Sequence, residues 1–392
     1  MMKVRGFEPR QREPGGSARK LTGQLSDGMR RRVEDSKATL AQPFKGITTD
    51  GAVTPDLFRI SEANLDTSEI KDATVTFLNS LDARARGSTT FDLDAKEWRQ
   101  WSNIHPFLFR HGSMLEELTT AQRHAALAIA QATLSESGFR TARDVMRLND
   151  AIGEITGRRE EYGEWVYWMS VMGTPSDTEP WGWQVDGHHL IINCFLLGGQ
   201  IVTTPMFMGS EPVAIETGKH AGTRVFEQEE SNALHLLRSL DSGQRKKAVL
   251  SDDLPGDVFT SAFRDNFELQ YDGLSYQDLS SPQQTLLLNL TETYINRTRT
   301  DQARVKMDEV KQHLDETYFA WMGSPTSDDS VFYYRIHSPV VLIEFDHQRG
   351  VALADDVPTR NHIHTIIRTP NGNDYGKDLL RQHRQQSDHS LQ

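Results

Sequence analysis

Histidines at two places in the chain have the types and spacing that a metal site needs. His362 and His364 lie in "NHIHTII", a β-branched run that predicts a strand. Alternate side chains of a strand leave the same face about 7 Å apart at their roots, so both imidazoles could reach one ion. The alternative is a pair of histidines on a solvated edge strand.

A second pair, His188 and His189, begins the apolar run of "WGWQVDGHHLIIN". If both belong to a strand, their side chains point to opposite faces and cannot enter the same core. At least one of them then needs a role other than packing. We therefore keep both His188 and His189 as candidate metal ligands.

A carboxylate could complete such a site. Glu344 lies in the apolar pattern "VVLIEFDH", where an unpaired carboxylate would be costly, so we expect it to meet a cation, a metal or water. With His362, His364 and one of the paired histidines it would form either a hydrolytic zinc site or a two-His-one-carboxylate iron site. Because Cys194 is the one cysteine, a thiolate cluster is excluded.

Four further residues are candidates for catalytic or supporting roles. Asp186 could orient an imidazole from beside the histidine pair. Arg335 offers a fork for a substrate carboxylate, or an ordinary salt bridge. Asp374 could cap the last helix, from which His383 could reach the site, although a solvated helix face explains His383 equally well.

The elements that must position these residues recur in order along the chain. A helix closing on Ser-Leu-Asp occurs at 80–82 and at 239–241, a capping box at Thr119–Gln122 and at Ser280–Gln283, and Met-Gly-Thr/Ser-Pro before a strand at 172 and at 322. An internal duplication explains these echoes, and recurrent capping and strand patterns are the alternative. We predict two helix-then-antiparallel-sheet halves, 57–215 and 225–385, packed as one α+β unit.

Residues 1–55 are rich in Gly, Ser, Pro, Arg and Lys and predict a disordered or weakly docked basic tail, with a transit peptide as the alternative. In the whole chain of 392 residues, 55 acidic residues outnumber 43 basic ones, giving a formal charge of −12. This balance argues against a nucleic-acid partner. No apolar run approaches the length that spans a bilayer, so we expect a cytoplasmic protein without a membrane partner.

The motifs quoted above, with "TTPMFMGSEPV", "YYRIHSPVVLIEFD" and "NHIHTIIRTPNGNDYGKDLLRQH", resemble the bacterial and fungal family called domain of unknown function 3500. The resemblance covers most of the chain beyond residue 60 and excludes the basic head. It implies a shared architecture and a shared site that includes His188, His189, Glu344, His362, His364 and Asp374, but no reaction. One departure is the long connection "HQRGVALADDVPTR" between Glu344 and His362.

These observations predict a metal-dependent enzyme that acts on a small organic substrate. A zinc or iron ion held by His and Glu would activate water or polarise a carbonyl, as in hydrolases and lyases. A non-haem iron oxygenase is the alternative, because the same ligands serve it. A second alternative is a non-enzymatic binding protein whose histidines do not converge.

Overall fold

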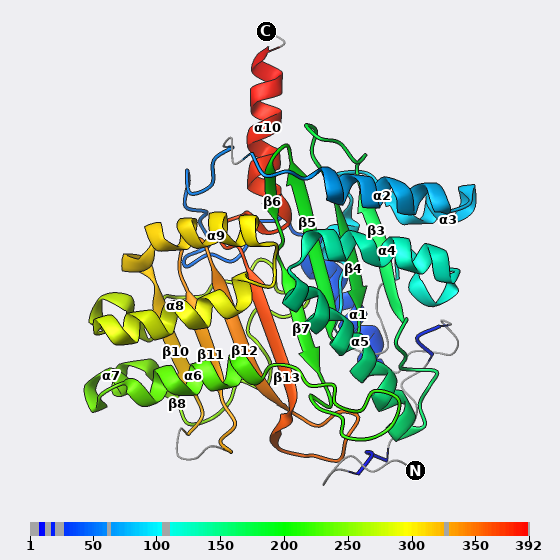
Figure 1. Cartoon of the computed structure of the whole chain (residues 1–392). Helices are drawn as coiled ribbons and strands as arrows, with labels where there is room; N and C mark the ends of the chain where they lie inside the picture. Colours follow the sequence, from blue (N-terminus) through cyan, green and yellow to red (C-terminus); the bar gives the residue numbers. More distant parts are fainter. Residues whose placement is uncertain are drawn as a thin grey trace.

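A computed structural model describes residues 8–11, 17–19, 27–60, 64–103, 110–324 and 329–390. Over these residues the chain builds one mixed sheet of 13 strands, with main strand order β1-β3-β4-β5-β7-β13-β12-β11-β10-β8 (Figure 1). β2, β6 and β9 pair at its side with β3, β5 and β10. The predicted α+β class, with largely antiparallel pairing, is confirmed.

The elements between residues 57 and 215 supply the first part of the sheet and four α-helices of the described chain. They are α2 (Ser68–Ser80), α3 (Ala83–Thr89), β1 (Thr90–Phe91), β2 (Ser113–Met114), α4 (Thr120–Thr133), α5 (Glu136–Thr156), β3 (Tyr167–Met172), β4 (Trp181–Gly187), β5 (Leu190–Leu197), β6 (Gln200–Val202) and β7 (Met206–Ser210).

The elements after residue 225 supply the rest of the sheet. They are α6 (Glu227–Ser239), α7 (Ser242–Ala248), β8 (Val249–Ser251), β9 (Leu274–Ser275), α8 (Ser281–Ile295), α9 (Thr300–Gln312), β10 (Tyr318–Met322), β11 (Tyr333–His337), β12 (Leu342–Arg349), β13 (Pro358–Arg368) and α10 (Lys377–Ser390). Two helices, two short strands, two helices and an antiparallel run thus follow one another in both parts. The halves 57–215 and 225–385 and the duplication itself stay predictions.

The recurring sequence signals have the same local function in both parts. Each Ser-Leu-Asp segment separates two helices, because Asp82 and Asp241 accept from Ala85 N and Gln244 N and so cap α3 and α7. The capping boxes predicted at Thr119 and Ser280 begin α4 and α8. The Ser-Leu-Asp segments thus end α2 and α6 and begin the next helix in each part.

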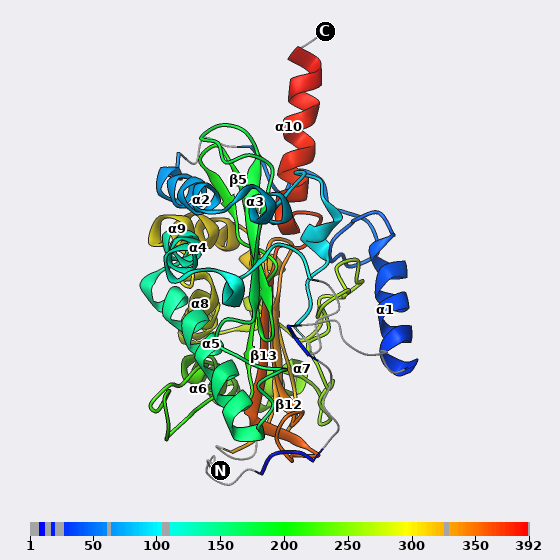
Figure 2. The ribbon, with the colours of Figure 1, turned by 90° about the vertical axis from the view of Figure 1, so that its right-hand side faces the viewer.

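The two faces of the sheet are covered differently. Helices α2, α4, α5, α6, α8 and α9 lie on one face, and α1 (Asp27–Leu40) with irregular segments lies on the other (Figure 2). Apolar side chains such as Phe77, Ile129 and Leu287 pack the helices onto the sheet and are 0–1% exposed. Val75 of α2 is 39% exposed and does not belong to this packed surface.

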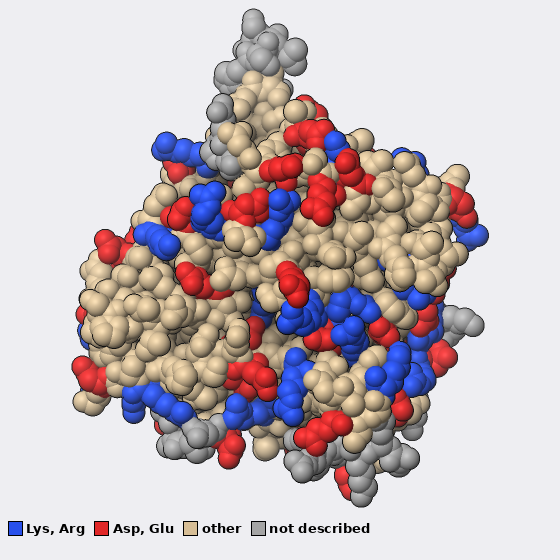
Figure 3. All heavy atoms as spheres, in the orientation of Figure 1, with Lys and Arg blue, Asp and Glu red and all other residues tan. Residues whose placement is uncertain are grey.

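The irregular segments cover a face of the sheet that is unusually polar. Gln184 donates to Trp98 O, Asp186 accepts from Ser102 N, and Glu344 accepts from Thr260 N. Buried polar groups need hydrogen-bond partners. The segments 92–103 and 252–273 therefore cover this face by bonding to its polar side chains and not by hydrophobic packing alone. This face positions the candidate site. On the helix-covered outer surface, Lys and Arg are interspersed with Asp and Glu (Figure 3).

The segment predicted as a tail contains more structure than its composition indicates. Its described part includes α1 (Asp27–Leu40), and the ordered stretch that follows is tied to the body, for instance where Arg99 donates to Leu40 O and Gln42 O. A polar helix can form here because tertiary contacts stabilise it, such as the hydrogen bond from Arg99 to the carbonyl of its last residue, Leu40. Within the described residues, no helix is long and apolar enough to cross a membrane.

Candidate metal centre

Two histidines of strand β13 and one from a distant turn meet at one point. The Nε2 atoms of His189, His362 and His364 lie 3.2 Å (189 to 362), 3.1 Å (189 to 364) and 3.1 Å (362 to 364) from one another. His362 and His364 share one face of β13, as their spacing predicts. All three side chains are buried, at 3–6% exposed.

His189 reaches the cluster from a turn and not from a strand. β4 ends at Gly187 and β5 begins at Leu190, so His188 and His189 form the two-residue connection of a hairpin. His189 has a φ of +63°, and its carbonyl accepts from Gly209 N at 2.8 Å. The prediction of consecutive strand residues on opposite faces is therefore wrong, because a turn frees both side chains from strand alternation.

Gly209 makes the convergence sterically possible. It lies in β7, between the turn and β13, and its register partner on β13 is His364. A Cβ at this position would lie 3.0 Å from His364 Cδ2, 3.2 Å from His189 Cδ2 and 2.7 Å from Ile363 O. Absence of a side chain on this central strand therefore allows the two rings to meet across it.

The partners of the opposite ring nitrogens fix which nitrogen carries the proton. His362 Nδ1 lies 2.7 Å from Arg349 O, and His364 Nδ1 lies 2.9 Å from Asp257 Oδ1. Carbonyl and carboxylate oxygens only accept, so both Nδ1 atoms must donate, and both Nε2 atoms present lone pairs. Two lone pairs 3.1 Å apart repel unless a cation lies between them.

The histidines are suited to bind a cation at neutral pH. Burial lowers the pKa of His362 to about 4. Burial, with the neighbouring histidines His188, His364 and His362, lowers the pKa of His189 well below its usual range. Neutral imidazole is the form that binds a metal, so these ligands need not lose a proton first.

The triangle of nitrogens has the size of a first coordination sphere. An ion about 2.05 Å from each nitrogen, the distance usual for zinc, would stand about 1 Å above their plane with N–metal–N angles of about 100°. Among the described residues, no fourth His, Cys, Asp or Glu ligand atom lies within 4.8 Å of all three. Three protein ligands with one side left for water or substrate are typical of catalytic sites and not of closed structural ones.

The structure does not bring His188 or Glu344 into the cluster. His188 Nδ1 lies 2.8 Å from Asn149 Oδ1, and its ring stacks on that of His189 at 3.9 Å. The Glu344 carboxylate accepts from Thr260 N at 3.0 Å and Thr260 Oγ1 at 2.6 Å. From the sequence we expect Glu344 to meet a cation, a metal or water. Its register partner Arg335 is a nearby cation, but its hydrogen bonds come from backbone and hydroxyl donors.

The other predicted residues also lie in structural pairs. Arg335 donates to Asp272 at 3.1 Å, which is the salt-bridge alternative. Asp374 is fully buried with Arg368 at 2.8 Å and accepts from Thr369 N, so it stabilises the end of β13. His383 on α10 lies 3.9 Å from Glu179. Asp186 accepts from Ser102 N, and burial raises its pKa well above the usual range.

Sequence reasoning missed two acidic residues that support the histidines. Asp257 orients His364 through Nδ1, in the carboxylate–histidine arrangement common behind metal ligands. Glu211 Oε2 lies 3.7 Å from His362 Nδ1. Asp257 lies in "LPGDV" and Glu211 in "GSEPV". Both segments have turn residues, and neither contains a signal that indicates the distant histidine.

The match to a family model extends over this whole site. The model for a protein of unknown function, DUF3500, matches residues 63–377. The chain belongs to the DUF3500 family. The predicted resemblance is confirmed, and the three histidines with Asp257 and Glu211 all lie within the matched range. Neither the curated proteins nor the solved structures gave a match.

Asp346 is another buried acid beside the cluster. It pairs with His364 in the register of β12 and β13, and its Oδ1 has no hydrogen-bond partner among the described residues. Burial, with the Asp257 and Glu344 carboxyls nearby, raises the pKa of Asp346 well above its usual range. Such a group can accept or donate a proton close to the histidines.

A second group of possible ligands is an ion-pair network. Asp150, Glu164 and His220 lie close together, but their carboxylates already have cationic partners. These are Lys219 at 3.2 and 2.9 Å from Asp150 and Glu164, Arg159 at 3.0 Å from Asp150, and Arg143 at 2.7 Å from Glu164. The positive charge that a metal would supply is present in these side chains.

A cavity of about 700 Å³ lies elsewhere, between α9, β6 and the segment 56–59. Met206 and Ile367 line it, and these two residues are register partners on β7 and β13. Ile367 points to the face opposite His362 and His364, because odd and even positions of β13 alternate. This cavity is therefore not the approach to the histidines.

Proposed function

We propose that this DUF3500 protein is a metal-dependent enzyme in which His189, His362 and His364 hold one divalent ion. The observation that carries the proposal is the triangle of Nε2 atoms, 3.1–3.2 Å on each side, with the lone pairs of His362 and His364 directed inward. Bound there, a divalent ion would lower the pKa of a water ligand or polarise a carbonyl group of the substrate.

Zinc and a hydrolase or lyase reaction fit this donor set best. Three neutral imidazoles leave the full positive charge of the ion to act on water, as in His₃ zinc sites. The iron alternative requires a carboxylate among the ligands in its two-His-one-carboxylate form, and Glu344 is held by Thr260 instead. The ligand set therefore favours hydrolytic or lyase chemistry over oxygen chemistry.

The residues around the histidines have separable roles. Asp257 holds the His364 ring and keeps its proton on Nδ1. Asp346 supplies a buried carboxyl group that could move a proton near His364. Phe207 packs edge-on against His364, with ring centroids 5.1 Å apart. Because the histidines are 3–6% exposed, the substrate we expect is a small organic molecule.

With this function we propose a cytoplasmic location and a small-molecule partner. Its one cysteine, Cys194, is buried and free, which fits the reducing cytoplasm. A small-molecule substrate is the partner we expect, and the acidic charge of −12 speaks against nucleic acid.

Metal analysis of protein purified without a histidine tag tests the proposal. We expect one equivalent of zinc in the wild type and in H383Q, whose histidine lies on α10, and less than a tenth of that in H189Q and H362Q. Hydrolysis of p-nitrophenyl acetate should follow the metal content. Oxygen-sensitive iron at one equivalent would favour the oxygenase alternative, and a metal-free wild type after zinc reconstitution would leave the binding-protein alternative.

A further inference from the structure

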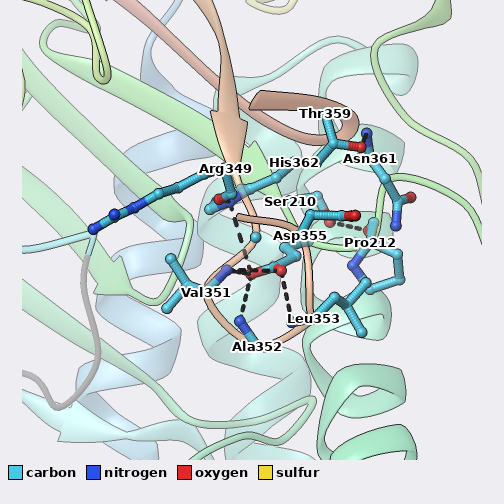
Figure 4. A network of polar contacts seen from close by, with 12 residues as sticks. Ser210, Pro212, Arg349, Val351, Ala352, Leu353, Asp355, Thr359, Asn361 and His362 are labelled. Carbon is cyan, nitrogen blue, oxygen red and sulfur yellow. Dashed lines mark hydrogen bonds and ion pairs between the residues drawn. The ribbon is translucent and has the colours of Figure 1, made fainter. Parts of the chain in front are cut away.

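The loop that joins β12 to β13 holds one metal ligand in place. It begins after Arg349, whose carbonyl accepts from His362 Nδ1 at 2.7 Å. Residues 350–357 form no strand, so the sheet does not satisfy their backbone groups. Charged side chains from two distant segments satisfy them instead. Figure 4 shows this loop beside His362.

Glu211, immediately after β7, binds the amide side of the loop. Its carboxylate accepts from Val351 N at 3.0 and 3.1 Å, from Ala352 N at 2.9 Å and from Leu353 N at 2.9 Å. The dashed lines of Figure 4 converge from these three residues. Successive N–H groups that point to one place form an anion-binding nest, and here a side chain of the protein fills it. The same carboxylate lies 3.7 Å from His362 Nδ1.

Arg10 binds the carbonyl side of the same loop. Its guanidinium donates to Asp355 O at 3.0 Å and to Gly350 O and Leu353 O at 3.3 Å each, and it forms an ion pair with Asp356 at 2.9 Å. Backbone bonds join the segments as well, from Arg10 N to Ala352 O and from Ala354 N to Glu8 O. Residues 8–10 lie outside the range 63–377 that matches the family model.

We propose that Glu211 and Arg10 are positioning residues for His362. The two charges hold the amide and carbonyl groups of one loop. The peptide bond from Arg349, the last residue of β12, to Gly350, the first residue of the loop, carries the carbonyl that accepts the hydrogen bond from His362 Nδ1. Without the two charges the loop leaves this position, the His362 ring loses its orientation, and Nε2 turns away from His189 and His364. The inference rests on the proposed metal centre, and it assigns a function to an N-terminal segment outside the family match.

The experiment compares E211Q and R10Q with R31Q, an exposed arginine on α1 that serves as the matched control. Zinc affinity is measured by competition with a chelator, and the cobalt(II)-substituted proteins are compared by visible absorption. We expect a 10- to 100-fold loss of affinity in E211Q, a smaller loss in R10Q and none in R31Q. The cobalt band should change in E211Q, which a global loss of stability would not cause in the folded fraction.

A second readout does not depend on metal. Nitrogen-15 NMR of the metal-free protein reports the His362 tautomer, and we expect the Nδ1–H form in the wild type and a mixture in E211Q. Wild-type affinity, cobalt spectrum and tautomer in both variants would overturn the inference while leaving the metal centre intact. A wild type that binds no metal would overturn the proposed function, and the tautomer then decides the positioning role. If E211Q does not fold, the half-buried position of Arg10 makes R10Q the deciding variant.

Discussion

Acid should destabilise the metal-free protein through His362, and the size of the effect follows from its burial. Burial lowers the pKa of His362 to about 4 from the value of 6.5 that an unfolded histidine has. Between these values the unfolded chain binds a proton that the folded chain does not, so stability decreases as pH falls through this window. Linkage gives a loss of about 2 kcal/mol between pH 7 and pH 5 from this one residue.

The assay is urea unfolding of the metal-free wild type and of H362Q at several pH values from 7 to 4. The free energy of unfolding of H362Q should depend less on pH, with a difference of about 2 kcal/mol accumulated by pH 5. Zinc-saturated wild type should resist acid to lower pH, because bound metal competes with the proton. Parallel pH profiles for the wild type and H362Q would refute the reasoning, since His362 would then titrate alike in both states.

Three substitutions separate metal binding from stability. D257N should weaken zinc binding about 10- to 100-fold, because a neutral amide is a weaker acceptor than a carboxylate and can also present its NH2 group to His364 Nδ1; equal chelator competition by D257N and the wild type would contradict this. G209A should lower zinc affinity at least about tenfold while costing about 1–3 kcal/mol of stability, since the new Cβ displaces both rings; full zinc content at wild-type affinity would count against it. E344Q should lose about 1–3 kcal/mol of unfolding free energy and keep one equivalent of zinc, and a loss of zinc would return Glu344 to the ligand set.

The strands, caps and spacing of the site were accessible from the sequence because they depend on neighbouring residues. Alternation places His362 and His364 on one face of β13, and the two hydroxyl–Gln boxes begin α4 and α8. The turn at His188 and His189 was not accessible, because its sequence also fits the start of an apolar strand. The resemblance to the DUF3500 family placed the site residues in one region but gave no ligand set.

Local sequence patterns are enough to predict histidines at metal-ligand spacing in an α+β framework with one cysteine. Which of these histidines meet depends on the tertiary structure. The hairpin connection before β5 and the strand β13 come together because β7 pairs with both, and Gly209 leaves the space between them. The same packing places Thr260 where it donates to Glu344, and it places Asp257 and Glu211 beside the Nδ1 atoms of His364 and His362. Such pairings depend on contacts between residues far apart in the chain, and local sequence patterns do not record them.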